Sequence, residues 1–389
     1  MKNHKNFNIM NSKVRKNNMV NNILSINSSF GKRLFSFLLG ISILSPSSSA
    51  LKSNDKNNMN FLSGTYKSDT ANNKRKKAAA GTGIVAAVAG LGLLGLRALA
   101  NSMIFPGIYM DKSCLPDIKD EKNVKLDDNL FVNRKFIEIG DLKGCSFKCE
   151  SPSSNELKNK CIILCGPNGS SAVNLVYKNA IKTLLDKGAS VVAVDYRGYG
   201  HSKLKVPSLR ISQNTLYNDG EKIYEYVSNN LGYKSIDIIT FGFSLGGSVA
   251  SHIADYVYSQ GQTLGGIILA SPINNLISAG NNATFSPLGW VARGVTLSQL
   301  DTNYNLRNVS KNTPIFICSG DNKDWLSFNN THLNKRIKEL GFTNVTEYIA
   351  PDCDHNQLNK MFEIEDFKDK NDSNLYKYIN SISHFIYPV

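Results

Sequence analysis

From residue 134 onward, short apolar runs alternate with longer segments whose apolar residues recur with helical spacing. Several runs are unbroken stretches of Val, Ile and Leu, which is typical of strands buried on both faces. The predicted strands are Lys135–Gly140, Cys145–Glu150, Cys161–Cys165, Ser190–Tyr196, Ser235–Phe241, Gly265–Ala270, Pro314–Cys318 and Val345–Ile349. The predicted helices are Ala172–Lys187, Asn214–Asn230, Leu245–Gln260 and Leu326–Leu340.

This alternation predicts an α/β fold: a mostly parallel sheet of about eight strands with helices on both faces. In such folds the active site lies at the carboxyl ends of the strands. The segment 274–312 interrupts the alternation, and we interpret it as a short lid-like insertion.

The N-terminal part of the chain has a different composition. Residues 1–77 are rich in Asn, Ser and Lys and poor in aromatic residues, which predicts a disordered basic arm. Within this arm, residues 32–50 have a basic start, an apolar core and a small-residue end at Ala50, the parts of a signal peptide.

A second apolar stretch, residues 78–96, contains no charged residue and is long enough to cross a bilayer as a helix. The basic run Lys74–Lys77 precedes it, so the positive-inside rule predicts a single-pass membrane protein with its main domain outside the cytoplasm. We set the transmembrane helix at 78–100, where small residues four apart would allow helix-mediated self-association. A buried soluble helix is the alternative, and a signal cleaved at Ala50 would oppose this topology.

The net charge of +14 is concentrated in the arm, where residues 1–77 contain fourteen Lys and Arg but two acidic residues. The remainder is nearly neutral and shows no basic stripe, which argues against nucleic-acid binding. The seven cysteines form neither a disulfide framework nor a metal-binding pattern, so we expect buried free thiols, no metal and no cofactor.

The chemistry-bearing motif is the stretch from Gly242 to Gly246, a Gly-x-Ser-x-Gly sequence centred on Ser244. It lies between a predicted strand and a predicted helix, as a nucleophile elbow does, where glycines allow neighbouring backbones to approach closely. A tight packing turn that happens to contain a serine is the alternative reading.

A serine nucleophile needs a base, and the base needs an acid to orient it. His355 follows the last predicted strand directly, whereas His252 lies inside the helix after the elbow. The other histidines lie in the arm, before the required position or near the terminus. Asp321 and Asp324 both follow the preceding strand, and their spacing does not decide between them.

Five stretches carry a family resemblance. They are MIFPG (103–107), SVVAVDYRGYGHS (190–202), LYNDGEKIYEYV (216–227), GFSLGG (242–247) and DHNQL (354–358). From about Met103 to the end, the chain resembles the α/β-hydrolase superfamily, which sets the predicted hydrolase domain at 104–389. It is most similar to a membrane-anchored branch with one N-terminal transmembrane helix and a prolyl-aminopeptidase-like core.

The resemblance also assigns two further roles. The family has His-Gly-x-x-Asp at the acid, and matching its final Asp and the following Leu-Ser-Phe selects Asp324. Its oxyanion loop reads His-Gly-Asn-Ala-Gly where this chain has CGPNGSS, and aligning the asparagines makes Asn168 a backbone donor together with Leu245. If Pro167 fell at that position instead, it would have no N–H to donate.

The function implied is a membrane-anchored serine hydrolase that cleaves an acyl ester or thioester of a small molecule, a lipid or an acylated protein. Three alternatives stay open: a peptidase of the same fold, a secreted bacterial effector hydrolase, and a catalytically silent membrane-tethered binding module. The altered oxyanion loop favours the last of these, while the ordered Ser, Asp and His candidates oppose it.

Overall fold

The computed structural model describes residues 115–202, 211–283, 298–321, 324 and 332–357, together with 90, 92, 94, 95, 104 and 105. The side chains of 280–283, 332, 334 and 335 are outside this description. The chain divides into two compact units, Met1–Lys74 and Arg75–Val389, and every described residue belongs to the second. The predicted arm and its signal-like segment at 32–50 therefore lie outside the described residues.

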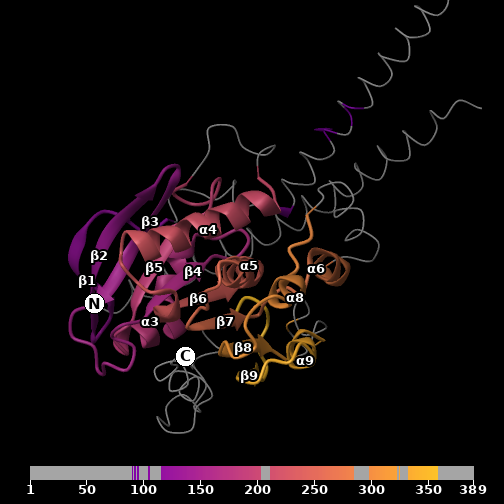
Figure 1. The fold of residues 1–389 in the computed structure, drawn as a ribbon. Helices are drawn as coiled ribbons and strands as arrows, with labels where there is room; N and C mark the ends of the chain where they lie inside the picture. Colours follow the sequence, from indigo (N-terminus) through magenta and orange to yellow (C-terminus); the bar gives the residue numbers. More distant parts are fainter. Residues whose placement is uncertain are drawn as a thin grey trace, which may run out of the picture. The chain divides into compact units, whose positions relative to one another are not determined.

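Within the described residues the core is a nine-stranded sheet in the order β1-β2-β3-β5-β4-β6-β7-β8-β9 (Figure 1). The strands are β1 Glu121–Asp127, β2 Leu130–Ile139, β3 Leu142–Cys149, β4 Cys161–Cys165, β5 Ser190–Asp195, β6 Ile238–Phe243, β7 Gly266–Ala270, β8 Ile315–Gly320 and β9 Val345–Ala350. Strands β4 to β9 are parallel to one another, whereas β1, β2 and β3 pair with their neighbours antiparallel. The predicted mostly parallel sheet is confirmed.

Helices cover both faces of this sheet (Figure 1). The described helices are η3 Ala172–Tyr177, α3 Asn179–Asp186, α4 Gln213–Asn229, η4 Ser235–Asp237, α5 Gly246–Ser259, α6 Leu276–Ala283, α8 Thr302–Leu306 and α9 His332–Glu339. Successive side chains of a strand point to opposite faces. Ile163 of β4 accordingly packs in the apolar cluster that includes α4 and α5, and its neighbours Ile162 and Leu164 pack in the cluster that includes α3.

Strand β1 is absent from the sequence-based prediction, and β2 begins at Leu130 rather than at Lys135. The reason is that β1 is an edge strand in which Leu126 alone is buried. Its charged sequence carries no apolar run to mark it, because edge strands commonly expose charged side chains.

The predicted membrane location is corrected by the structure. Among the described residues, no helix combines the length and the hydropathy that a membrane span requires. The described residues of the predicted span are helical and exposed, namely Gly90, Gly92, Leu94 and Gly95, and the rest of 78–100 lies outside the description. The prediction relied on the absence of charge over nineteen residues, but Gly and Ala contribute little apolar surface to a span.

The segment predicted as an insertion, 274–312, contains α6 and α8, and its two ends are bonded to each other. The N–H of Leu276 donates to the carbonyl of Gln299 at 2.7 Å, and the N–H of Thr302 donates to the carbonyl of Asn274 at 2.9 Å. The segment therefore leaves and re-enters the core at one place. A lid-like role for it stays a prediction.

A buried amide holds α8 against α5. The Asn305 side chain is 4% exposed, and its Nδ2 donates to the carbonyl of Ser248 at 3.0 Å, to Ser251 Oγ at 3.1 Å and to Tyr217 Oη at 3.2 Å. A buried polar group that loses its partners leaves unsatisfied donors and acceptors behind, which is costly. Asn305 thus fixes the returning end of the insertion.

We expect Asn305→Ala to lower the free energy of unfolding by about 1–3 kcal/mol, because it leaves the buried carbonyl of Ser248 and two hydroxyls without this donor. Equilibrium unfolding in urea measures the change. Asn229→Ala, at the exposed end of α4, is the matched control and should change stability by less than about 0.5 kcal/mol. Equal losses in the two variants would contradict the role given to Asn305.

Candidate active site

Ser244 lies on a strained turn between a buried strand and a helix. Strand β6 ends at Phe243 and α5 begins at Gly246, so the chain reverses direction over Ser244 and Leu245. Ser244 has a φ of +55°, a left-handed backbone conformation that residues other than glycine seldom adopt. Its N–H donates to the carbonyl of Ala270 at 3.0 Å, which ties the turn to the end of β7.

The three glycines around Ser244 are each required by close backbone approach. A Cβ at Gly246 would lie 2.0 Å from the carbonyl oxygen of Cys165, and one at Gly242 would lie 2.4 Å from the carbonyl oxygen of Gly246. A Cβ at Gly247 would lie 2.7 Å from Cβ of Pro272. The glycines therefore let the end of β4 and the chain after β7 pack directly on the turn.

The structure brings together the three residues predicted to act in chemistry. Ser244 Oγ lies 2.8 Å from His355 Nε2, and His355 Nδ1 lies 2.9 Å from Asp324 Oδ1. Asp324 is fully buried, and Ser244 and His355 are 7% and 8% exposed. Because the carboxylate of Asp324 accepts the Nδ1 proton, Nε2 is left as an acceptor for the Ser244 hydroxyl.

Asp321, the competing acid, occupies a different place. Its Oδ2 accepts the N–H of Asp352 at 2.7 Å, and its N–H donates to the carbonyl of Ala350 at 3.0 Å. Its own carbonyl accepts the N–H of Asp324 at 2.9 Å. Asp321 thus connects the loop after β8 with the loop that carries His355, and it is Asp324 that contacts the imidazole.

The predicted oxyanion loop lies against the serine turn. A Cβ at Gly246 would be 2.8 Å from the carbonyl oxygen of Gly166, the first residue after β4. The side chain of Asn168 is engaged, since its Nδ2 donates to the carbonyl of Ile104 and its Oδ1 accepts from Tyr199 Oη at 3.0 Å. Within the described part of the chain, no hydrogen-bond acceptor is found for the backbone N–H of Asn168 or of Leu245.

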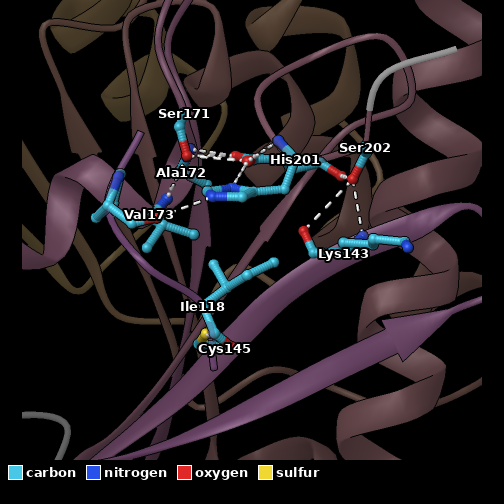
Figure 2. Close-up of polar contacts among 10 residues, drawn as sticks. Ile118, Lys143, Cys145, Ser171, Ala172, Val173, His201 and Ser202 are labelled. Atoms are coloured by element: carbon cyan, nitrogen blue, oxygen red, sulfur yellow. Dashed lines mark hydrogen bonds and ion pairs between the residues drawn. The ribbon is translucent and has the colours of Figure 1, made fainter. Parts of the chain in front are cut away.

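A buried carboxylate fixes the rest of this loop. Asp195, 1% exposed, accepts from Ser171 Oγ at 2.8 Å, from the N–H of Ala172 at 2.7 Å and from the N–H of His201 at 2.9 Å. His201 Nδ1 also contacts Asp195 at 2.9 Å, and its Nε2 lies 2.9 Å from the carbonyl of Pro116. The side chains of Ser171 and His201 thus contact the same carboxylate, and Figure 2 shows these two side chains close together. His201 is therefore a structural residue of the turn after β5.

Comparisons with known proteins agree with this architecture. The family model described as "Serine aminopeptidase, S33" matches residues 156–315, a span that contains Ser244 and ends before Asp324 and His355. The crystal structure of an α/β-hydrolase from Vibrio vulnificus superposes with a TM-score of 0.52 at 24% identity, covering 70% of this chain and 91% of that one. The chain has the α/β-hydrolase fold.

Two curated proteins are similar to this chain over about half of its length. A multifunctional-autoprocessing repeats-in-toxin protein of Vibrio vulnificus is 30% identical over 188 residues, which are 46% of this chain and 4% of the toxin. An uncharacterized protein of Acanthamoeba polyphaga mimivirus is 30% identical over 196 residues, 46% of this chain and 65% of the viral protein. These comparisons support the α/β-hydrolase fold and do not show a membrane-anchored branch.

The candidate site includes an aromatic residue that the sequence-based interpretation missed. The ring of Phe243 stacks on the imidazole of His355, with centroids 5.8 Å apart and an angle of 22° between the planes. Phe243 is 9% exposed, so it gives the imidazole an apolar neighbour on one face. The one signal in the sequence was an aromatic residue directly before the serine of the motif.

A buried cysteine, Cys165, lies at the end of β4 beside the elbow. The six described cysteines are buried and free, as predicted, and burial raises the pKa of the nearby Cys165 thiol to about 12. That thiol therefore stays protonated near neutral pH, and a protonated thiol is a poor nucleophile. In the described ranges, no group of three or more His, Cys, Asp or Glu side chains is arranged to hold a metal ion.

We expect Gly246→Ala to destabilise the fold strongly, at the upper end of the about 1–3 kcal/mol that overpacking costs, because the contact is with backbone that cannot rotate away. Thermal and urea unfolding measure the loss. Gly92→Ala is the control, since a Cβ there meets no atom within 4 Å. A fully stable Gly246→Ala protein would show that the close approach to Cys165 is not a constraint.

Proposed function

We propose that this protein is a serine hydrolase that cleaves acyl esters or thioesters. The observation that carries the proposal is the hydrogen-bonded series from Ser244 through His355 to Asp324, with the serine on a strained elbow. A packing turn would need neither the positive φ at a serine nor a buried imidazole paired with a buried carboxylate. The same series weighs against a catalytically silent binding module.

In the proposed mechanism, Ser244 Oγ attacks the substrate carbonyl while His355 Nε2 takes its proton. The carboxylate of Asp324 holds the imidazole in the required tautomer and stabilises the imidazolium that forms. The negative charge on the carbonyl oxygen is stabilised by the backbone N–H groups of Asn168 and Leu245. His355 then returns the proton to the leaving alcohol or thiol.

The acyl group left on Ser244 is released by water. His355 takes a proton from the water as the water oxygen attacks the acyl carbonyl, and the proton goes to Ser244 Oγ as the carboxylic acid leaves. The wall formed by Phe243 keeps one face of the imidazole dry, which strengthens its electrostatic interaction with Asp324. The proposed substrate has an acyl carbonyl and an oxygen or sulfur leaving group, and it is a small molecule, a lipid or an acylated protein.

A second candidate function is peptide hydrolysis, and the description of the matching family model as a serine aminopeptidase is the observation that favours it. The two candidates share the nucleophile and differ in the leaving group. A panel of p-nitrophenyl esters and acyl thioesters of increasing chain length, run beside aminoacyl p-nitroanilides, separates them. Turnover of the anilides with inert esters would favour the peptidase.

We expect Ser244→Ala to abolish fluorophosphonate labelling and to lower ester turnover by about a million-fold, because a triad nucleophile is lost. The circular dichroism spectrum should be unchanged, since a hydroxyl of a turn is removed and no core group. Ser259→Ala, the same substitution at the exposed end of α5, should label like the wild type. Strong labelling of Ser244→Ala would identify another nucleophile and overturn the proposal.

We expect Asp324→Asn to lower kcat/KM by roughly 10⁴-fold, because an amide cannot hold the imidazole as the carboxylate does. Asp321→Asn should have a small effect, since the amide oxygen can still accept the N–H of Asp352. Steady-state kinetics on the best ester of the panel measures both. The reverse ranking would show that Asp321 is the acid.

A further inference from the structure

Tyr199 is a buried residue that the mechanism above does not use. It lies in the turn after β5, is 1% exposed, and donates from its hydroxyl to Asn168 Oδ1 at 3.0 Å. Burial raises the pKa of its phenol above the ordinary value. The hydroxyl therefore keeps its proton and remains a donor over the whole range of working pH.

The amide of Asn168 is held from both ends. Its Nδ2 donates to the carbonyl of Ile104, and the neighbouring Phe105 is 1% exposed in the same apolar cluster as Tyr199. A carbonyl can only accept, so the NH₂ must face Ile104 and the amide oxygen must face Tyr199. The orientation of the side chain is thus fully determined by these two partners.

Packing does not hold Asn168, because the residue is exposed and lies in a turn between β4 and η3. The loop beyond it is anchored separately, through the contacts of Ser171 and Ala172 with Asp195 (Figure 2). The Asn168 end of the loop therefore depends on its two side-chain hydrogen bonds. One of them, from Tyr199, can be removed by an isosteric substitution.

We propose that Tyr199 is a positioning residue for the oxyanion site: its hydroxyl holds the Asn168 side chain and so fixes the direction of the Asn168 backbone N–H. This inference rests on the proposed function, since it assigns Asn168 N–H as a donor to the reacting carbonyl oxygen. Tyr199 does not touch substrate, and it acts through Asn168 alone.

The geometry makes Tyr199→Phe a clean test. The rings of Tyr196 and Tyr199 pack edge to face, with centroids 5.9 Å apart and planes at 86°, and a phenylalanine keeps that contact. The substitution removes one hydroxyl and leaves the apolar packing in place. Loss of the donor frees the Asn168 amide at one end, so its N–H is no longer aligned for the charge that develops on the substrate oxygen.

The experiment compares wild type, Tyr199→Phe, Asn168→Ala and the double variant on the ester that the panel identifies. We expect Tyr199→Phe to lower kcat by roughly tenfold to a hundredfold with little change in KM, because misalignment weakens transition-state stabilisation and not ground-state binding. Binding of a trifluoromethyl ketone, whose adduct with Ser244 carries the same oxyanion, should weaken by a similar factor. The pH profile should keep its shape, since no titrating group has changed.

The double variant tests whether Tyr199 acts through Asn168. Asn168→Ala keeps the backbone N–H and removes the amide that bonds both Tyr199 and Ile104, so it should cost at least as much as Tyr199→Phe. Residues that act through one contact are not additive, and the double variant should then be no worse than Asn168→Ala alone. An additive loss would overturn the inference.

A matched control is available at Tyr233, whose hydroxyl donates to Ser190 Oγ at 2.8 Å. Ser190 begins β5, at the opposite end of that strand from the turn that carries Tyr199. Tyr233→Phe makes the same chemical change and should leave kcat unaltered. If Tyr199→Phe has wild-type kcat, or if both variants lose activity in proportion to thermal stability, Tyr199 is only structural.

The two proposals fail in different ways. A wild-type protein that neither reacts with fluorophosphonate nor turns over any substrate of the panel overturns the proposed function and this inference together. An active wild type that depends on Ser244, combined with an unaffected Tyr199→Phe, overturns the inference alone.

Discussion

The strained backbone at Ser244 is the constraint on which the rest of the site depends. A serine with φ of +55° is maintained because surrounding structure over-determines it, here through the bond from its N–H to Ala270 and through direct backbone packing on Gly242 and Gly246. The same packing brings the chain after β4 within contact of the turn. The proposed nucleophile and the proposed oxyanion loop are therefore positioned by one set of close approaches.

The parallel sheet supplies the remaining groups at the same edge. Strands β4, β6, β8 and β9 share a direction, and the loops after them carry Asn168, Ser244, Asp324 and His355 respectively. These loops are also joined directly, since Asp321 bonds the N–H of Asp352. Placing four polar groups from distant parts of the chain thus requires few interactions beyond the register of the sheet.

Much of this arrangement was predictable, and the failures have physical causes. Apolar runs identified the strands from β2 to β9, and the glycine pattern around Ser244 identified the elbow, because both signals are local. Strand β1 was missed because its stability comes from pairing with β2 and not from burial of its own residues. Asp321 and Asp324 were separable by resemblance alone, since hydrogen bonding across two loops leaves no trace in spacing. The contacts of Phe243 and Tyr199 depend on where their rings lie in space, which the sequence does not reveal. The membrane prediction was wrong because it relied on the absence of charge rather than on hydropathy.

The two ends of the 274–312 segment are hydrogen-bonded to each other, so the segment can change independently of the sheet. Because Leu276 bonds to Gln299 and Thr302 bonds to Asn274, the segment enters and leaves the core at one point. Sequence between these anchors can lengthen, shorten or be exchanged by recombination without altering the register of β7 or β8, as surface connections generally tolerate. In a diverging lineage, the segment can therefore change while the candidate site is inherited intact.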